Sequence, residues 1–556
     1  MNAAVTKEYD RWCALTKDDE LCKELEEIKG EEEKISDAFF KSLEFGTGGL
    51  RGIIGAGTNR LNVYTVRRAS LGLGNFIKNQ SATPSAVIGY DTRIKSDVFA
   101  KTTAEALASL GIKVWLFTSP LPTPILSYAV RELKCSAGVM ITASHNPAEY
   151  NGYKVYGADG CQITDNAAKA ILKEIEKVDY FTSDENREKS EGGDILTVQS
   201  SLYESYLGKI SELSVLYGAP ADKSISIIYT PLNGTGLIPV SDVLKNNGFS
   251  NVTLVKEQAE HDGNFPTCKY PNPELKEAMQ LALDYANRTG ADLILATDPD
   301  CDRVGVGVKS SDGYKLLSGN EVGAILLDYV LSQKKEHGKL PDMPVAIKTI
   351  VTSSLASSVA SDYGVEILDF LTGFKYIGEK IGELESRGEL HRYVFGFEES
   401  CGYLSGTHAR DKDGVNAALL IAEVCAFCKA KNTTLLSKLE ELYQKHGYVH
   451  NYLFSYSLLG EDGLLKMKKA MQALRDNEKS FCGMPTIKLL DYKEGINGLP
   501  KSDVICAYMQ NAKVTVRPSG TEPKIKIYAE ITGEKERAEK ELCDIKECID
   551  AFIKSM

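Results

Sequence analysis

An acidic loop carries the clearest chemical signal in the sequence. In TDPDCDR, residues Asp298, Asp300 and Asp302 alternate directly after the apolar run ADLILAT (291–297). Alternating carboxylates in an extended loop can face the same way, and such oxygen ligands suit a hard divalent cation, magnesium or manganese. An EF-hand is excluded, because Arg303 stands where that loop needs glycine and Lys309 where it needs glutamate. The spacing therefore predicts a magnesium site.

Two other interpretations of this loop stay open. DPDCDRV resembles the DxDx[TV] box of phosphatases of the haloacid dehalogenase class, which use an aspartate nucleophile. In that case Asp300 would be phosphorylated and Ser144 would be incidental. The structural alternative is that the three carboxylates cap the turn that follows.

A second polar loop follows the apolar run AGVMITA (137–143) and begins with adjacent Ser144 and His145. Neighbouring side chains in an extended strand point apart, so we expect no hydrolase dyad from this pair. The G-x-S-x-G elbow of such enzymes is also missing around Ser144. A serine at a loop apex, opposite a metal and basic groups, could instead carry a phosphoryl group. The alternative is a serine that caps a turn.

Phosphate binding is indicated near the C-terminus by TVRPSGTEPKIKI, which combines a guanidinium fork with hydroxyls and turn amides. The residues are Arg517, Ser519, Gly520 and Thr521. A glycine-rich segment, GTGGLRG (46–52), adds Arg51 but fits neither a Walker A box nor a GxGxxG fingerprint.

A further polar loop lies in GFEESCGYLSGTHARDKDG. Glu398 and Ser400 offer acceptors and a donor at a spacing that suits sugar hydroxyls, and His408 and Lys412 follow as titratable groups. Surface glutamates are the structural alternative for this segment.

The elements that position these loops form a pattern repeated three times. Short β-rich runs alternate with amphipathic helical stretches, which predicts parallel or mixed α/β sheets. The expected strands are 85–91, 112–118 and 137–143; 224–230, 251–257 and 291–297; and 344–350, 364–370 and 391–397. The third strand of each repeat ends in one of the polar loops, where ligands of α/β sheets gather. From about residue 438 the pattern changes to a smaller α+β domain.

The length and net charge of the chain bound the number of domains and the classes of partner. A chain of 556 residues is long enough for three or four domains. The net charge of −12 argues against nucleic acid as a partner. The sequence contains neither an apolar run long enough to span a membrane nor a secretory signal at its N-terminus, and its 13 cysteines suit a reducing compartment. We expect a cytoplasmic protein that is not bound to membranes.

Three local predictions complete the survey. The acidic stretch up to about residue 45 predicts one or two surface helices with a solvated face, and QKKEHGKLPDMP (333–344) predicts a surface loop. Cys425 and Cys428 have CxxC spacing but lie in an apolar helical pattern without further metal ligands, so we expect core residues.

The ordered set TASHNPAEYNGYKVY, DPDCDR, GFEES and RPSGTEPKIKIY resembles the α-D-phosphohexomutase superfamily, and GTGGLRG and TGFKYIGEK indicate its phosphoglucomutase/phosphomannomutase branch. The resemblance extends from about residue 40 to the end. It implies a heart-shaped molecule with three α/β domains of similar topology and a C-terminal domain around a central cleft. We place the domains at 1–206, 207–318, 319–437 and 438–556.

The resemblance also implies roles for individual residues. Ser144 would be the phosphoserine, and its phosphate would hold Mg²⁺ together with Asp298, Asp300 and Asp302. Proton handling and catalysis would involve His145, Lys154, Arg303 and His408. Substrate would be bound by Arg51, Arg93, Thr372, Gly373, Lys375, Glu398, Ser400, Lys412, Arg517, Ser519, Gly520 and Thr521. Tyr403 departs from the mannose enzymes, which place a histidine there, so the main general base stays open.

The activity implied is that of a phosphoglucomutase, which interconverts α-D-glucose 1-phosphate and glucose 6-phosphate. A glucose 1,6-bisphosphate intermediate would turn over within the cleft and serve as activator, and we expect the C-terminal domain to move. Phosphomannomutase and phosphopentomutase are alternatives within the superfamily. A sugar 1,6-bisphosphate synthase, a phosphatase and a catalytically silent scaffold are further alternatives. The sequence leaves monomer and dimer equally open.

Overall fold

The structure is a computed structural model that describes residues 2–46, 48–182, 193–457, 463–477, 479–496, 498–518 and 524–555. The chain forms two compact units. The first consists of Met1–Gly319 with Phe374–Asn432, and the second of Asn320–Gly373 with Thr433–Met556. No helix among the described residues is both long and apolar enough to cross a membrane.

The first unit begins with three helices, α1 (Ala3–Leu15), α2 (Asp19–Glu27) and α3 (Glu32–Phe39). The prediction of one or two solvated helices is therefore wrong in number and in character. Trp12 is fully buried and contacts the rings of Phe39, Tyr64, Tyr180 and Phe181 edge-on. The charged residues cover the outer faces while this aromatic cluster fixes the helices to the unit.

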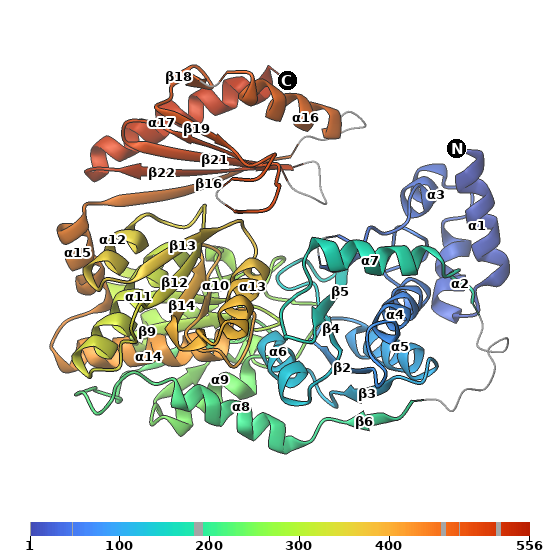
Figure 1. Ribbon diagram of the computed structural model, residues 1–556, viewed down its shortest axis with the longest axis horizontal. Coiled ribbons are helices and arrows are strands. Elements are labelled where there is room, and N and C mark those ends of the chain that lie inside the picture. The colour runs from blue at the N-terminus through green and yellow to red at the C-terminus, as the bar shows by residue number, and fades with distance from the viewer. Residues whose placement is uncertain are drawn as a thin grey trace. The chain divides into compact units, whose positions relative to one another are not determined.

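A six-stranded sheet follows, with the order β1-β5-β4-β2-β3-β6 (Figure 1). Its strands are β1 (Gly49–Ile53), β2 (Ser85–Tyr90), β3 (Lys113–Leu116), β4 (Ala137–Ile141), β5 (Tyr150–Gly157) and β6 (Ile195–Thr197). The connecting helices are α4 (Val63–Lys78), α5 (Ser96–Ala108), α6 (Thr123–Glu132) and α7 (Asp165–Glu176). Strand β4 is buried along its whole length, as its continuous apolar sequence predicts. It pairs in parallel with β2 and antiparallel with β5, so the loop at its end emerges beside both.

The second sheet of this unit has the order β11-β10-β9-β7-β8. It comprises β7 (Ile227–Thr230), β8 (Val252–Leu254), β9 (Leu293–Thr297), β10 (Val304–Ser310) and β11 (Gly313–Leu317). Helices α8 (Ser200–Glu212), α9 (Leu237–Asn246) and α10 (Lys276–Thr289) accompany it, with the short η2 (Lys256–Gln258). Because β9 and β10 are antiparallel neighbours, the acidic loop is the turn that joins them.

The first unit ends with α13 (Phe374–Ser386), η3 (Leu390–Arg392), the antiparallel pair β14 (Tyr393–Glu398) and β15 (Gly402–Leu404), and α14 (Gly414–Ala430). Asp413 caps α14 by accepting hydrogen bonds from the backbone N–H groups of Val415 and Asn416. Cys425 and Cys428 are buried in this helix, which confirms their predicted place in the core.

The second unit contains α11 (Gly319–Glu336), β12 (Val345–Thr349), α12 (Leu355–Asp362), β13 (Glu366–Phe370) and α15 (Leu435–His446). Strands β12 and β13 are parallel. The predicted loop at 333–344 is corrected at its start, because α11 continues to Glu336.

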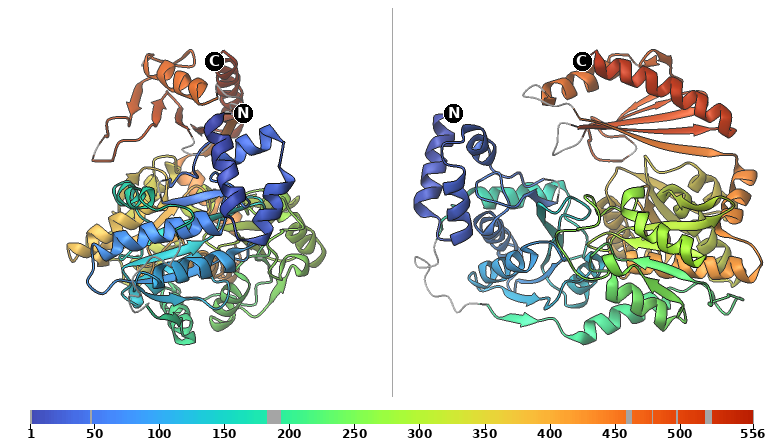
Figure 2. Two further views of the ribbon diagram at one scale, coloured as in Figure 1. Left: turned by 90° about the vertical axis from the view of Figure 1, so that its right-hand side faces the viewer. Right: turned by 180° about the vertical axis from the view of Figure 1, so that it is seen from behind.

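The C-terminal part of the second unit is an antiparallel sheet of order β16-β22-β21-β20-β19. It consists of β16 (Val449–Ser457), β19 (Lys488–Asp491), β20 (Ile505–Tyr508), β21 (Ala512–Pro518) and β22 (Lys524–Thr532). A small hairpin of β17 (Ser480–Phe481) and β18 (Met484–Pro485) follows α16 (Gly463–Arg475) in the sequence, and α17 (Lys535–Lys554) ends the chain. Figure 2 shows α16 and α17 on the same face of this sheet, where their apolar residues complete its core. The predicted α+β character of this region is confirmed.

Candidate active site

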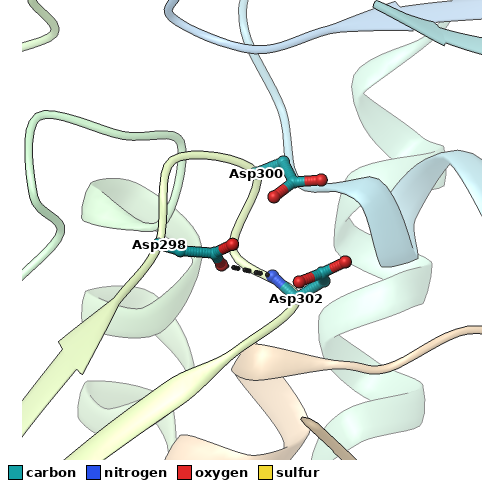
Figure 3. Close-up of side chains that lie close together, drawn as sticks. All are labelled: Asp298, Asp300 and Asp302. Atoms are coloured by element: carbon teal, nitrogen blue, oxygen red, sulfur yellow. Dashed lines mark hydrogen bonds between the residues drawn. The ribbon is translucent and has the colours of Figure 1, made fainter. Parts of the chain in front are cut away.

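The acidic loop brings three buried carboxylates together. One oxygen of each of Asp298, Asp300 and Asp302 lies within 4.8 Å of those of the other two (Figure 3). The turn is closed by its own backbone, because the N–H groups of Asp302 and Arg303 donate to Oδ1 of Asp298 at 3.1 and 3.0 Å. Cys301 adopts a left-handed conformation, φ 51°, at the apex. The predicted clustering of the three aspartates is confirmed.

Two lysines and a threonine contact this triad. Lys154 of β5 donates to Oδ2 of Asp300 at 2.8 Å and lies 3.7 Å from Oδ2 of Asp302. Lys412 lies 3.2 Å from the same oxygen of Asp302. Thr123, the first residue of α6, donates its hydroxyl to Asp300 at 2.8 Å. Lys154 and Lys412 thus partly balance the buried negative charge of the three aspartates.

Burial and repulsion by Asp302 and Asp300 raise the pKa of Asp298 well above its usual range. Burial would also raise the pKa of Asp300, but Lys154 outweighs it and holds that pKa far below its usual range. The pKa of Lys154 is raised because the carboxylates of Asp300 and Asp302 overcome the opposing effect of burial. Three carboxylates this close disfavour simultaneous ionisation, so the site favours an added positive charge.

The donor set fits a divalent cation. Oδ1 of Asp300 and Oδ1 of Asp302 are buried and accept no hydrogen bond from the described residues. A buried carboxylate oxygen without a donor is costly unless a cation contacts it. Hard oxygen ligands of this kind are those that magnesium prefers.

Ser144 lies against the triad. It follows β4, adopts φ 53° and donates its hydroxyl to Oδ2 of Asp298 at 2.8 Å. Its Oγ also lies 3.1 Å from Nδ1 of His145. The prediction that the two side chains point apart is wrong, because the left-handed backbone at Ser144 removes the strand alternation on which it rested. Ser144, His145, Lys154 and the three aspartates form one cluster.

The two arginines predicted beside this cluster differ in exposure. Arg51 of β1 is exposed, and its Nη1 lies 3.5 Å from Oδ1 of Asn146. The guanidinium of Arg93 is fully buried under the Ser144 loop. Arg303 contacts Glu274 at 3.4 Å and Asp302 at 3.9 Å, so its guanidinium lies beside the acidic loop.

The third polar loop supplies several further groups. Glu398 is buried at the end of β14, and Ser400 lies in the turn before β15. The stem of Lys412 crosses the backbone of Gly402, where an added Cβ would lie 2.0 Å from Cδ of the lysine. Lys375 is buried and pairs with Asp165 at 2.7 Å. Lys412 is therefore the residue of this set that contacts the acidic triad directly.

His408 and Tyr403 are held in place by structural partners. Nε2 of His408 lies 2.7 Å from the carboxylate of Asp413, and its ring is 5.9 Å from that of Tyr206. Tyr403 is buried in β15 and donates to the carbonyl of Gly319 at 3.3 Å. The Tyr403 hydroxyl is thus engaged in a hydrogen bond to a backbone carbonyl.

The remaining predicted residues belong to the second unit. Thr372 and Gly373 are half-buried in a bend, where Gly373 has φ 118°, and Arg517 is half-buried in β21. Ser519, Gly520 and Thr521 lie outside the described residues.

Comparison with known proteins assigns most of the chain to one family. Models of the phosphoglucomutase/phosphomannomutase family match α/β/α domain I at residues 42–181, domain II at 204–313, domain III at 318–446 and the C-terminal domain at 465–547. The chain belongs to this family. The predicted fold class, three α/β domains followed by a C-terminal domain, is thereby confirmed, as is the superfamily resemblance.

Relatives of known name support the assignment. A phosphoglucomutase of Staphylococcus haemolyticus is 38% identical over 506 residues, which cover 88% of this chain and 90% of the relative. A phosphoglucomutase of Staphylococcus saprophyticus is 36% identical over 524 residues, covering 91% and 94%. This phosphoglucomutase/phosphomannomutase family member is therefore a mutase, an enzyme of the isomerase class.

Solved structures agree in fold. A phosphoglucomutase/phosphomannomutase family protein from Burkholderia thailandensis has a TM-score of 0.69 at 19% identity, covering 91% of this chain and 97% of its own. The phosphoprotein parafusin, a phosphoglucomutase from Paramecium in an open form, has a TM-score of 0.69 at 17% identity, covering 92% and 95%.

Several residues at or near the site were not predicted from the sequence. Thr123 starts a helix 177 residues from the aspartate that it contacts, and no local pattern marks it. Asp411 accepts hydrogen bonds from Tyr156 at 2.8 Å and from Lys412 at 3.2 Å, and so links two site elements. Asp91 follows β2 and could have been found, since it obeys the strand-end rule that identified the other loops.

Proposed function

We propose that the protein interconverts α-D-glucose 1-phosphate and glucose 6-phosphate by passing a phosphoryl group through Ser144. One observation carries the proposal: the Ser144 hydroxyl lies 2.8 Å from Asp298 within a buried acidic triad that two lysines flank. The likeness to phosphoglucomutases over most of the chain supports glucose as the sugar.

The reaction begins with phosphorylated Ser144. The bond between Oγ and phosphorus breaks while the 6-hydroxyl oxygen of glucose 1-phosphate bonds to phosphorus and gives its proton to a base of the site. The bisphosphate formed then turns over; Oγ of Ser144 bonds to the 1-phosphorus, the bond from that phosphorus to the 1-oxygen breaks, and the 1-oxygen takes the proton back, leaving glucose 6-phosphate. Such transfers ask the protein mainly for alignment and charge neutralisation.

His145 and Lys154 are the groups that we propose for proton handling at Ser144, because both lie within reach of its oxygen or of the triad. A positioned base contributes about 10²–10⁴ to the rate. His408 is a further candidate, although its nearest charged partner is Asp413.

Mg²⁺ is the cation that we propose for the triad, held by Asp298, Asp300 and Asp302 with the Ser144 phosphate. When bound, it would neutralise charge on the transferring phosphoryl group. Glucose 1,6-bisphosphate would activate the enzyme by phosphorylating Ser144.

Substrate recognition is assigned by the same proposal. Arg303 would contact phosphoryl oxygens, and Glu398 and Ser400 the sugar hydroxyls. Further substrate contacts would come from Arg51, Thr372, Gly373, Lys375, Lys412, Arg517, Ser519, Gly520 and Thr521. The domain boundaries 1–206, 207–318, 319–437 and 438–556, a cytoplasmic location, the absence of nucleic-acid partners and a monomeric or dimeric state stay predictions from the sequence.

The test is the initial rate of isomerisation of glucose, mannose, glucosamine and ribose 1-phosphates, with magnesium, a trace of glucose 1,6-bisphosphate and a monitor of free phosphate. Glucose 1-phosphate should react fastest without phosphate release. Ser144→Ala should abolish turnover, whereas Ser200→Ala, an exposed serine at the start of α8, should leave it unchanged. Stoichiometric phosphate release would favour a phosphatase, and near-normal turnover of Ser144→Ala would exclude the phosphoserine.

A further inference from the structure

Arg93 lies beneath the Ser144 loop with its guanidinium fully buried. Its two terminal nitrogens donate to four backbone carbonyls of that loop. The carbonyl of Ser144 accepts at 2.5 Å, that of Pro147 at 2.8 Å and that of Tyr150 at 3.0 Å, and that of Asn146 accepts as well. One guanidinium thus fixes the positions of four backbone carbonyls of the loop relative to one another.

The N–H of Ser144 is held by a second chain of hydrogen bonds, which leads back to Arg93 through Asp91. The Ser144 N–H donates to Oγ1 of Thr142 at 2.8 Å, and the Thr142 hydroxyl donates to Oδ2 of Asp91 at 2.6 Å. Asp91 is buried, and its second oxygen accepts the backbone N–H of Arg93 at 2.9 Å and the hydroxyl of Ser96 at 2.8 Å. The N–H and C=O of Ser144 are therefore both fixed.

This double attachment explains the conformation of Ser144. With φ 53° the residue lies in the left-handed region, which non-glycine residues adopt at a cost and keep only where their surroundings hold them there. An unconstrained serine would return to the extended or right-handed region. Its Oγ would then lose the position from which it reaches Asp298.

Arg93 is also closed off from ligands. Its guanidinium stacks over the ring of Phe265 at 4.9 Å. Gly263, in the same loop as Phe265, packs so closely that an added Cβ would lie 2.5 Å from the backbone nitrogen of Ile94. With carbonyls at its edge and an aromatic ring over its face, the side chain has no open path to a phosphosugar.

We infer that Arg93, Asp91 and Thr142 are positioning residues that hold Ser144 in the left-handed conformation needed for phosphoryl transfer, and that Arg93 does not bind substrate. The family resemblance predicts Arg93 as a substrate-binding group, so this inference replaces that expectation. It rests on the proposed role of Ser144 as the phosphoryl carrier.

The sharpest test removes one hydroxyl. Thr142→Val keeps the shape of the side chain but loses the acceptor for the Ser144 N–H, and Thr142→Ser keeps that acceptor. The protein is mixed with glucose 1,6-bisphosphate that carries labelled phosphates, and the transfer of label to Ser144 is followed in a single turnover. We expect Ser144 of Thr142→Val to be labelled about 10²-fold more slowly than Ser144 of the wild type, while the final amount of label per chain is unchanged. Thr142→Ser should stay within about threefold of the wild type.

Arg93 is tested by separating kcat from KM. Arg93→Met should lower kcat about 10²-fold with little change in KM for glucose 1-phosphate, and Arg93→Lys should recover part of kcat because it keeps donors for the carbonyls. Arg51→Met, which removes an exposed arginine proposed to contact substrate, should raise KM instead. If Arg93→Met raises KM while kcat is kept, Arg93 binds substrate and the inference is overturned.

The remaining outcomes are also decisive. If the final amount of label on Thr142→Val falls in proportion to its labelling rate, fewer chains of the variant are folded. The Thr142 hydroxyl then serves only folding, which overturns the positioning role. If Thr142→Val and Thr142→Ser both label at the wild-type rate, the hydrogen bond is dispensable and the inference again fails. Failure of the proposed function is distinguishable, because the wild-type protein itself would then take up no label on Ser144.

Discussion

At the scale of single residues, the three polar loops of the first unit share a backbone device. Ser144, Cys301 and Cys401 have φ values of 53°, 51° and 60°, although none is a glycine. A left-handed residue costs roughly 1–2 kcal/mol, and such strain collects at functional sites. Each residue follows a buried strand and turns a polar loop back sharply. The sequence predicts the loops but not the left-handed backbone at these three positions, because serine and cysteine rarely adopt that conformation.

Thr123 offers a prediction about metal affinity. Its hydroxyl donates to Oδ2 of Asp300, so Thr123→Val leaves that ligand less firmly oriented, whereas Thr123→Ser retains the bond. Residues that orient a ligand in this way typically affect metal affinity by about 10–100-fold. We expect Thr123→Val to weaken Mg²⁺ binding by that factor in titration calorimetry and to raise the magnesium concentration that supports half-maximal activity. Equal affinities for the two variants would show that the hydroxyl does not orient Asp300.

Tyr403 gives a prediction of the opposite kind. Its hydroxyl is buried and donates to the carbonyl of Gly319, and its ring stacks near Phe397 at 6.4 Å. Tyr403→Phe should therefore leave kcat/KM and its pH profile unchanged and lower stability by about 1 kcal/mol, the usual value of one hydrogen bond. Loss of one limb of the pH profile in this variant would instead make Tyr403 a proton-transfer group.

At the scale of elements, the nine strands expected in the three repeats are predictable because each is a short, largely apolar run bounded by turn-forming residues. Strand β9 was expected at 291–297 and lies at Leu293–Thr297, and β13 was expected at 364–370 and lies at Glu366–Phe370. The end of α11 is less predictable, since Gln333–Glu336 are polar residues without an early breaker and the helix continues to Glu336, two residues before Gly338. The number and burial of the N-terminal helices differ from the prediction because Trp12 packs against Tyr180 and Phe181, which lie more than 100 positions away in the sequence.

Helix α14 contains a buried carboxyl that predicts a pH dependence of stability. Glu423 is 1% exposed and accepts the backbone N–H of Val215 at 3.3 Å, and burial raises its pKa to about 6. A carboxyl group whose pKa is higher in the folded state takes up a proton on folding. It therefore favours folding at low pH, and this contribution disappears as pH rises from 4.5 through about 6. The change amounts to about 2 kcal/mol.

Glu423→Gln should remove this dependence. The thermal midpoint of the variant relative to the wild type should rise between pH 5 and pH 7 and then level off. Glu385→Gln is the matched control, because the hydrogen bond with Arg131 lowers the pKa of Glu385 to about 2. Its stabilising effect is lost only as pH falls below about 4.5, so its midpoint difference should be constant from pH 5 to pH 8. A constant difference for Glu423→Gln as well would contradict the raised pKa.

At the scale of the whole molecule, the repeated pattern of strands predicted the fold class but not the composition of the compact units. Residues 374–432 pack with the first 319 residues, whereas 320–373 pack with the C-terminal part. That division depends on contacts distant in sequence, such as the pairing of Lys375 with Asp165, which no local pattern reports. The heart shape, the central cleft and the movement of the C-terminal domain stay predictions.

The division into two units leads to a prediction about metal removal. All three aspartates of the triad belong to the first unit, so bound Mg²⁺ should stabilise that unit selectively. At a magnesium concentration 100 times the dissociation constant, the stabilisation is about 2.7 kcal/mol. Hydrogen–deuterium exchange of metal-free protein, before and after magnesium is added, should show new protection in peptides covering 141–157 and 293–304. Peptides covering 345–370 and 505–518 of the second unit should be unchanged.

The control for this measurement is Asp300→Asn, which should lose the magnesium-induced protection because a ligand charge is removed from the triad. Because this variant also loses the ion pair with Lys154, its exchange must be compared with and without metal rather than with the wild type. Equal magnesium-induced protection in both units would mean that the metal site is not confined to the triad. Protection in Asp300→Asn equal to that of the wild type would place the cation elsewhere in the chain.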